Sequence, residues 1–556
     1  MTDRRRRQAA VAALILLAAV AVAEQAHAVY GVTRHYVTGD QAIMWVAARD
    51  WGRFAFHQPT FYGQSYWTNF EGIPIEALRR LGVPLTTAAP FAYAALNVGC
   101  WLVLGAAAWR RGRYHLAALA FAAPTLLTSF LSVYNSYVGS TGRLAAVAGG
   151  AGLLIDPEAR PARGVAWVLL IGGSVLDGSA LVFTVPVAAW VLIRRLRLGT
   201  RPWRPEGLGA ETATMAVAAI PALAWVVGLR AFFAAHPDYA MTDLSLRLHR
   251  AVLRQSLDRP EQFFHMFAPE LWRAWWLPLL VLVGLVVVLI ASRRWERAVP
   301  GVLVVALVLA VMSTTRAGLV RDVFVLPRAR LLAGLPYALW FLFGLATGLD
   351  DSPPRRSGHG VSRFQLAAIA AIAGLALTTA AVRLADFDGR VASATTYGTH
   401  TKRWSPPPPN RHLVDDCHAD AALARSAGTG LVVYLHDHAS AYGCAALGVG
   451  VDTLTPGWER RTWRLTDEAS QTRRAVVLVG VDPDLCAEAE GQVSTCRTLE
   501  QRTLSGRPET TAVVTFPRRS AIDLLRSLDV PVRGFGPGCH LIGGPLHHVP
   551  QCRAGA

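Results

Sequence analysis

Apolar residues along this chain are gathered into long blocks separated by short polar segments. Eleven blocks approach or reach the ~20 residues that an α-helix needs to cross a bilayer. We expect membrane spans near 9–30, 86–109, 115–134, 141–155, 164–176, 178–193, 212–229, 272–292, 298–315, 331–349 and 364–383. The pattern therefore predicts a polytopic α-helical membrane protein. The fifth and sixth blocks are short, and an alternative for them is a re-entrant pair that meets at Asp177.

Arginines at the ends of these blocks predict the orientation. Runs such as Arg4–Arg7, Arg110–Arg113 and Arg194–Arg197 fall in segments that this scheme places inside. Short cytoplasmic loops are enriched in Arg and Lys, so we expect a multi-pass protein of the cytoplasmic membrane with its N-terminus inside and its C-terminus outside. The N-terminal arginines followed by the apolar run 9–23 also fit a cleavable signal peptide. Either alternative leaves the segment after residue 31 outside.

Composition and charge agree with this class. The chain has 556 residues, of which 53% are hydrophobic and 17% are charged, which is too apolar for a soluble chain of this length. The formal charge of +17 would suggest nucleic acid as the partner of a soluble protein. Here many arginines flank apolar blocks and anchor them in the membrane, so no nucleic-acid partner is predicted.

A soluble domain is predicted after the last apolar block. We expect a membrane domain at 1–383 with its first outer loop at about 31–85, a Pro-rich linker at 384–410, and an extracytoplasmic domain at 411–556. Short β-branched runs at 431–435, 475–479 and 511–515 predict strands. Helix-like stretches such as Ser520–Ser527 lie among and after them, so the domain is expected to be a small α/β domain.

Six of the seven cysteines lie in this C-terminal segment: Cys417, Cys444, Cys486, Cys496, Cys539 and Cys552. An even set confined to one soluble segment predicts disulfides and an oxidising compartment, although the pairing cannot be deduced from sequence. A zinc site is the alternative, because His436, His438, His540, His547 and His548 lie in the same region. The segment lacks the CxxC or other spacing typical of zinc ligands, so no metal site is predicted.

The first outer loop opens with Thr38-Gly39-Asp40-Gln41, which has the form of a capping box. A helix is expected to start here with Asp40 in its first turn, where the helix dipole favours an ionised carboxylate. Apolar residues at 42, 43, 46 and 47 form a stripe that would lay this helix along the membrane surface. The alternative is that Asp40 only caps the helix.

The features that follow Asp40 carry a resemblance. They are Phe61-Tyr-Gly-Gln64-Ser-Tyr66, then Glu71, then the apolar 73–78. Their order resembles that of bacterial GT-C membrane glycosyltransferases, the group of protein-O-mannosyltransferases and lipid A aminoarabinose transferases. Weaker similarities extend over about 8–383. The resemblance implies a GT-C-like fold and an acid of the first outer loop that acts in sugar transfer from a polyprenyl-phosphate carrier, a role that maps onto Asp40.

Sugar transfer needs a base for the acceptor hydroxyl, cations for the departing phosphate and polar groups around the sugar. Asp40 is the candidate base and Glu71 a second catalytic acid. Gln64 and Tyr66 are candidates for sugar binding. Asp177 is another candidate substrate-binding residue, because an ionisable group at a turn within the bilayer region is costly unless it is paired or lines a cavity.

Candidate cations lie in two later segments. Arg328 or Arg330, before the tenth apolar block, could pair with phosphate through a guanidinium fork, and the alternative is an interfacial anchor. Arg247 and Arg250, with Arg254, are expected on one face of a helix lying at the interface. That face would hold an anionic lipid head group or simply be solvated.

Together these features predict an integral membrane glycosyltransferase. It would move a sugar from a polyprenyl-phosphate donor to a cell-envelope acceptor, whether glycan, lipid or protein, on the outer face of the cytoplasmic membrane. A transporter or flippase is the alternative, although the chain shows no repeated halves. An inactive GT-C-like scaffold is another, because Gln41 stands where many relatives have the second acid of a pair. No cofactor is certain, and a divalent cation stays an open alternative.

Overall fold

The structure is a computed structural model of the chain. It describes residues 2–31, 33–35, 39–64, 67–127, 140–155, 160–198, 207–242, 247–248, 250–258, 260, 276–315, 331–349, 361–387, 410–435, 438–457, 459–482, 484–489, 491, 493–504, 507–530, 532, 539–540 and 551–552. The chain forms two compact units. The first comprises 1–28, 93–228 and 244–390, and the second comprises 29–92, 229–243 and 391–556.

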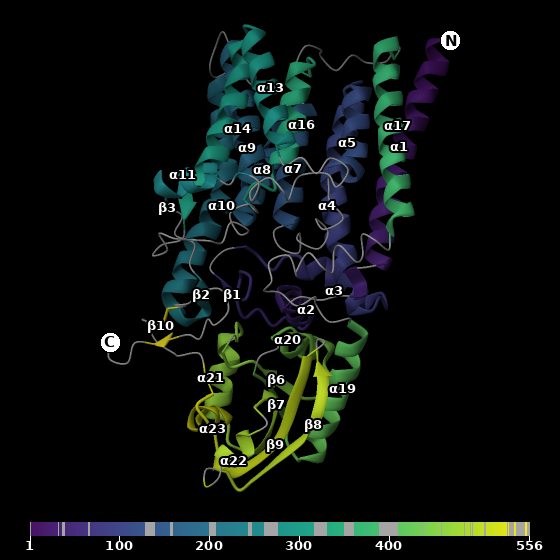
Figure 1. Ribbon diagram of the computed structural model, residues 1–556. Helices are drawn as coiled ribbons and strands as arrows, with labels where there is room; N and C mark the ends of the chain where they lie inside the picture. The colour runs from purple at the N-terminus through teal and green to yellow at the C-terminus, as the bar shows by residue number, and fades with distance from the viewer. Residues whose placement is uncertain are drawn as a thin grey trace. The chain divides into compact units, whose positions relative to one another are not determined.

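The first unit is built from helices, which Figure 1 shows running side by side. Within the described residues, six segments are long and apolar enough to cross a membrane: α1 (Asp3–Gly31), α4 (Leu85–Arg110), α9 (Leu181–Leu198) with the turn η2 (Gly178–Ala180) before it, α10 (Leu208–Ala235), α14 (Trp295–Ser313) and α17 (Arg363–Ala385). Five apolar helices are shorter: α5 (Tyr114–Leu126), α7 (Ser140–Ile155), α8 (Arg160–Leu176), α13 (Leu277–Ala291) and α16 (Leu335–Ala346).

Each of the eleven expected spans overlaps one of these helices. The prediction of a helical membrane protein is therefore confirmed, with six candidate spans. The number of eleven crossings stays a prediction, because the shorter helices fall below the ~20 residues of a full crossing.

Small residues let α7 and α8 pack closely. A Cβ atom placed on Gly149 would lie 2.3 Å from the Leu170 backbone nitrogen, and one on Gly173 would lie 2.3 Å from the Ala146 nitrogen. Helices within membranes associate through such close backbone approach, since lipid offers no hydrophobic driving force between them. This pair carries Asp177 at the end of α8.

The second unit contains a five-stranded mixed sheet in the order β6-β5-β7-β9-β8. The strands β5 (Leu431–Tyr434), β6 (Asp452–Leu454) and β7 (Arg473–Val481) are parallel. The strands β9 (Arg507–Arg519) and β8 (Thr495–Leu504) complete the sheet in antiparallel pairing and are its longest strands in Figure 1. The sheet supplies a core that includes Leu431, Val433, Val476, Leu478 and Val514.

Five helices accompany the sheet: α19 (Asn410–Ser426), α20 (His438–Leu447), α21 (Thr462–Ser470), α22 (Leu485–Glu488) and α23 (Ala521–Ser527). The predicted runs at 431–435, 475–479 and 511–515 coincide with β5, β7 and β9, and the predicted helix near 520 is α23. The expected C-terminal α/β domain is thus present. One disulfide, Cys417–Cys444, joins α19 to α20, and another, Cys486–Cys496, joins α22 to β8.

The segment 31–85, which the sequence predicts to be the first outer loop, lies in this second unit. It contains α2 (Gly39–Gly52), β1 (Gly63–Gln64) and α3 (Gly72–Arg80). Strand β1 pairs in parallel with β2 (Ala240–Thr242), which brings in the short segment 229–243. The compact units therefore divide the chain differently from the predicted domains, which grouped this loop with the membrane helices.

Candidate functional site

Helix α2 begins at Gly39, so Asp40 lies in its first turn, as the sequence predicts. Thr38, the predicted cap, lies outside the described residues. The predicted apolar stripe of α2 is buried, and so are Gln41, Met44, Trp45 and Ala48 around it. Burial on all sides results from packing against α3 and α20. The expectation that the stripe lies on the membrane surface is therefore wrong: the helix that carries Asp40 is covered by protein.

Glu71, the second predicted acid, stands directly before α3 and is fully buried. The start of α3 is pressed onto α2, because a Cβ atom on Gly72 would lie 3.2 Å from the Ala48 Cα atom. The two candidate acids are thus carried by neighbouring helices, one in the first turn of α2 and the other just before α3. Burying a carboxylate is costly, so the full burial of Glu71 indicates a specific role for this residue, structural or chemical.

Gln64 lies at the end of β1 within a buried hydrogen-bonded turn. Its carbonyl oxygen accepts from the side-chain amide of Gln58 at 2.7 Å and from the hydroxyl of Thr60 at 2.6 Å. Asn69 closes the turn by donating to the Thr60 carbonyl at 2.5 Å. The Gln64 Oε1 atom is buried without a hydrogen-bond partner among the described residues. Tyr66, predicted beside it, lies outside those residues.

A cluster that the sequence did not indicate lies beside this turn. The hydroxyl of Tyr62 donates to Asp50 Oδ2 at 2.9 Å. Burial raises the pKa of Asp50, although the Tyr62 hydrogen bond acts in the opposite direction. Burial and the Asp50 charge together raise the pKa of Tyr62 well above its usual value. The tyrosine therefore stays a hydroxyl donor throughout the physiological pH range.

Aromatic rings from three distant segments meet at Trp463 of α21. His57 stacks on the Trp463 ring with centroids 4.3 Å apart, and Tyr62 meets it edge-on at 4.8 Å. Tyr239, from the segment before β2, lies at 5.8 Å. Ring edges and faces of this kind suit the apolar faces of sugars. The only sequence signal for Asp50 was a carboxylate ten positions after Asp40, and nothing in the sequence linked it to Trp463.

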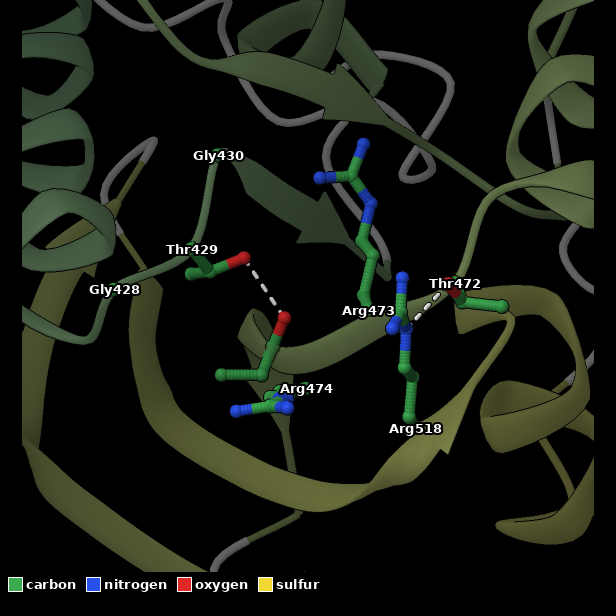
Figure 2. A pocket seen from close by; sticks show the side chains of 8 residues that line it. Gly428, Thr429, Gly430, Thr472, Arg473, Arg474 and Arg518 are labelled. Atoms are coloured by element: carbon green, nitrogen blue, oxygen red, sulfur yellow. Dashed lines mark hydrogen bonds between the residues drawn. The ribbon is translucent and has the colours of Figure 1, made fainter.

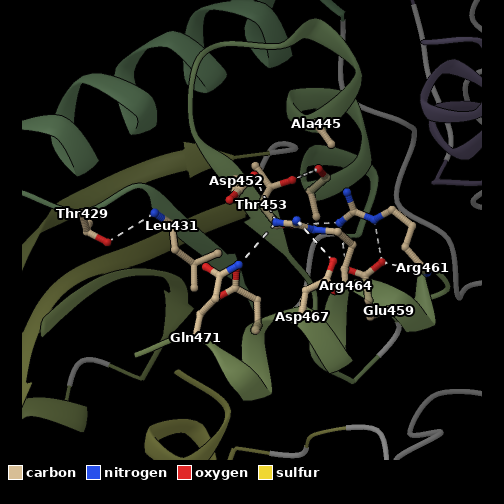
Figure 3. Close-up of polar contacts among 12 residues, drawn as sticks. Thr429, Leu431, Ala445, Asp452, Thr453, Glu459, Arg461, Arg464, Asp467 and Gln471 are labelled. Carbon is tan, nitrogen blue, oxygen red and sulfur yellow. Dashed lines mark hydrogen bonds and ion pairs between the residues drawn. The ribbon is translucent and has the colours of Figure 1, made fainter. Parts of the chain in front are cut away.

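The C-terminal domain contacts the loop through the turn that carries Glu459, Arg460 and Arg461. The Arg460 guanidinium lies 5.6 Å from the Phe61 ring centroid, and its Cβ atom approaches Gly63 closely. Figure 3 shows the Glu459–Arg461 ion pair that stabilises the turn, with a shortest distance of 2.7 Å. Burial alone would lower the pKa of Arg461, but the adjacent carboxylate raises it. Arg461 therefore stays charged, and it ties the turn to β6 by donating to the Thr453 carbonyl at 2.8 Å.

Arg49 makes a further contact between the loop and the C-terminal domain. Its guanidinium donates to the Ala445 carbonyl near the end of α20 and lies against Gly448. The last carbonyls of a helix lack intrahelical donors, and arginine is a suitable partner for them. This contact holds the second half of α2 against α20.

Asp177 lies in the first unit and is paired. It caps η2 by accepting from the Ser179 backbone N–H at 3.0 Å, and its Oδ2 atom forms an ion pair with Arg143 at 3.1 Å. Arg143 also donates to Asn97 at 3.4 Å. Both partners are almost fully buried. The sequence expectation that such an acid is paired or lines a cavity is met by pairing, and its predicted contact with substrate stays a prediction.

The predicted basic helix is shorter than expected. Helix α11 (Arg250–Asp258) begins at Arg250, whereas Arg247 belongs to β3 (Arg247–Leu248). Strand β3 pairs with β4 (Thr314–Thr315), and this pairing takes Arg247 out of the helix. The prediction that Arg247 shares one helical face with Arg250 is therefore wrong. Arg250 is exposed on α11, with Arg254 one turn further on.

Other predicted residues fall on undescribed positions. Arg328 and Arg330 lie outside the described residues. Within the part of the chain that the structure describes, no group of three His, Cys, Asp or Glu side chains could hold a metal ion. The predicted pairing of Arg328 or Arg330 with the phosphate therefore stays a prediction.

Comparison with known proteins identifies a solved structure with a similar fold. Neither protein-family models nor curated proteins match the chain. Among solved structures, the chain is similar to ArnT from Cupriavidus metallidurans in the apo state, with a TM-score of 0.51 and 16% sequence identity. The match covers 91% of this chain and 98% of ArnT. The predicted GT-C-like fold is thereby shown for nearly the whole molecule.

Proposed function

We propose that this chain is a membrane glycosyltransferase of the GT-C kind. It takes a sugar from a polyprenyl-phosphate donor and passes it to a cell-envelope acceptor on the outer face of the cytoplasmic membrane. The proposal is carried by one observation: an ArnT-like fold over 91% of the chain with an acid in the first turn of α2, in the loop that follows the first candidate span. Fold alone does not fix an activity, so the site has to supply the chemistry.

Asp40 is the proposed general base. An acceptor hydroxyl oxygen forms a bond to the anomeric carbon while its proton passes to the Asp40 carboxylate. The bond from that carbon to the phosphate oxygen breaks, and polyprenyl phosphate departs with the electron pair. Attack from the face opposite to the phosphate inverts the configuration. The position of Asp40 in the first turn of α2 favours the ionised carboxylate that a base requires.

Glu71, the second proposed acid, would fix the sugar or assist Asp40. Its full burial next to α2 supports a positioned rather than a solvated carboxylate. Gln64 supports sugar binding, because its Oε1 atom has no partner among the described residues and amide oxygens accept from sugar hydroxyls. Arg328 or Arg330 remains the proposed phosphate partner. Arg250 on the exposed face of α11, with Arg247, is proposed to bind anionic head groups.

The acceptor is proposed to bind where the loop meets the C-terminal domain. The aromatic rings of His57, Tyr239 and Trp463 gather there from three segments. Sugars bind such surfaces by stacking their apolar faces on the rings while their hydroxyls reach polar neighbours. The C-terminal domain would thus help to select the acceptor.

The test is transfer from radiolabelled polyprenyl-phosphate sugars into lipid, glycan and protein fractions by the purified protein in detergent. Asp40→Asn is expected to lower the rate by about 10²–10⁴-fold, the range for loss of a general base. Glu71→Gln is expected to lower it as well. Asp484→Asn removes an exposed carboxylate far along the chain and serves as the matched control, with unchanged transfer.

Each variant must melt like the wild type for the comparison to count. Full transfer by a folded Asp40→Asn variant would contradict Asp40 as the base. No transfer by the wild type from any donor would favour a transporter or an inactive scaffold.

A further inference from the structure

A polar pocket of about 410 Å³ opens in the C-terminal domain, where β5 and β7 begin and β9 ends. Figure 2 shows the side chains that line it. They come from three short stretches of chain: Gly428, Thr429 and Gly430, then Thr472, Arg473, Arg474 and Ala475, then Arg518. Three of these eight residues are arginines, which makes the pocket a candidate for an anionic ligand.

Among the described residues, an acid neutralises Arg473 but neither of the other two arginines. Arg473 donates to both oxygens of Glu468, at 2.8 and 2.6 Å, and this pairing raises the pKa of Arg473. Arg474 and Arg518 are exposed, and neither forms an ion pair with another described residue. The pocket therefore carries an excess of positive charge that the described residues do not balance.

The walls of the pocket are fixed before any ligand arrives. The Thr429 hydroxyl donates to the Ala475 carbonyl at 2.8 Å, which ties the start of β5 to β7. The Arg518 Nε atom donates to the Thr472 hydroxyl at 2.9 Å, a bond drawn as a dashed line in Figure 2. A guanidinium oriented in this way loses less freedom on binding than a free one.

Gly428 and Gly430, which line one side of the pocket, leave room beside these arginines. Gly428 has a φ of +67°, in the left-handed region, and a Cβ atom there would meet no atom within 4 Å. The same construction at Gly430 lies 3.8 Å from the Arg473 Nη1 atom, so a side chain there would approach that guanidinium. The pocket volume lies within the range of small-molecule sites, ~300–1,000 Å³. The pocket is therefore larger than a lone inorganic anion requires.

We propose that this pocket binds a phosphate monoester or diester, with Arg474 and Arg518 pairing with the phosphate oxygens. Guanidinium forks match pairs of phosphate oxygens, and the remaining volume accommodates the organic group that bears the phosphate. The phosphate can come from a soluble ester or from a lipid head group. This site is distinct from the aromatic cluster around Trp463, because the two share no residue. The proposal does not depend on the proposed transfer activity.

The test measures binding of glycerol 3-phosphate to the full-length protein in neutral detergent by titration calorimetry. The wild type is expected to bind with an affinity that falls as salt is added. The double variant R474A/R518A is expected to lose about tenfold or more, as charge-assisted hydrogen bonds are lost. The control R497A/R526A removes two positive charges from exposed arginines outside the pocket and should bind like the wild type.

A second arm uses nanodiscs of neutral lipid with or without phosphatidylglycerol. If the protein binds only the discs that contain phosphatidylglycerol, and this binding depends on Arg474 and Arg518, the phosphate ligand is a lipid head group. If the protein binds glycerol 3-phosphate, the ligand is a soluble phosphate ester. Should the alanine variant melt early, R474K/R518K is compared with R497K/R526K, and only the former should weaken binding. Equal affinities of pocket and control variants, or no binding of either probe by the wild type, would overturn the proposal.

Discussion

Asp50 shows how one side chain can acquire a property that its position in the sequence does not reveal. It lies in the last turn of α2, and its carboxylate accepts a hydrogen bond from the Tyr62 hydroxyl. Burial raises its pKa more than the hydrogen bond lowers it. The folded protein therefore holds the Asp50 proton more tightly than the unfolded chain does. Stability must depend on pH through this residue.

The sign of that dependence follows from the direction of the shift. Between the unfolded pKa of Asp, about 3.9, and the raised folded value, the folded state binds more protons, so stability falls as pH rises. Asp50→Asn should remove this fall. Melting temperatures of the wild type, Asp50→Asn and the exposed control Asp484→Asn, measured from low to neutral pH, check it. Parallel curves for the wild type and Asp50→Asn would contradict the assignment.

The Arg143–Asp177 pair leads to a different residue-scale expectation. Asp177→Asn leaves the Arg143 charge buried without its carboxylate, so the variant should lose about 3–5 kcal/mol of stability. Replacing both residues with leucine should cost much less, because no charge is then left unpaired. Thermal melting of the two variants tests this. If Asp177→Asn melts like the wild type, the pair is not structural and a role with substrate gains weight.

At the scale of elements, the contact between β1 and the turn at 459–461 depends on Gly63. Its φ is +77°, and a Cβ atom there would lie 2.8 Å from the Arg460 Cβ atom. Gly63→Ala should separate the loop from the C-terminal domain and speed limited proteolysis within 53–62. Gly82→Ala is the matched control, because Gly82 has a φ of +87° but no atom within 4 Å of such a Cβ atom. Equal cleavage rates in both variants would show that backbone strain alone matters.

The sequence predicted the elements that have strong local signals. The parallel strands β5 and β7 were found because they are short, buried β-branched runs. Strand β8 was missed because it lies at the edge of the sheet and consists mainly of polar residues, which give no apolar run. Strand β6 was missed because it has only three residues. The stripe on α2 was assigned to the membrane because its periodicity cannot distinguish lipid from α20, which lies almost 400 residues later in the chain. The same limit applied to Arg247, whose strand partner lies at 314–315.

The short pair β10 (Cys539–His540) and β11 (Gln551–Cys552) extends the cysteine prediction. The antiparallel register sets Cys539 opposite Cys552. Cα atoms of such cross-strand partners lie about 4.5–5.5 Å apart, within the range that disulfides span. We expect mass spectrometry of unreduced, alkylated peptides to find a Cys539–Cys552 link in addition to Cys417–Cys444 and Cys486–Cys496. Alkylation of Cys539 without prior reduction would contradict this.

For the whole molecule, sequence was sufficient for the class and the fold. The GT-C-like fold was predicted from the order of features in the first loop and is shown by the likeness to ArnT. Sequence could not show that this loop folds into one unit with residues 391–556. That grouping depends on contacts between residues far apart in the chain, such as His57 with Trp463 and Arg49 with Ala445. For this reason, the sequence did not predict the aromatic cluster around Trp463.

The same grouping makes the orientation of the molecule testable. Disulfides persist in oxidising compartments, so Cys417–Cys444 and Cys486–Cys496 favour an extracytoplasmic C-terminal domain. The loop that carries Asp40 must lie on the same side, because it packs on α20. Alkaline phosphatase, which needs disulfides, should be active when fused after residue 556 and inactive when fused after Arg111 in the short segment between α4 and α5. The reverse pattern would place Asp40 in the cytoplasm and contradict transfer on the outer face.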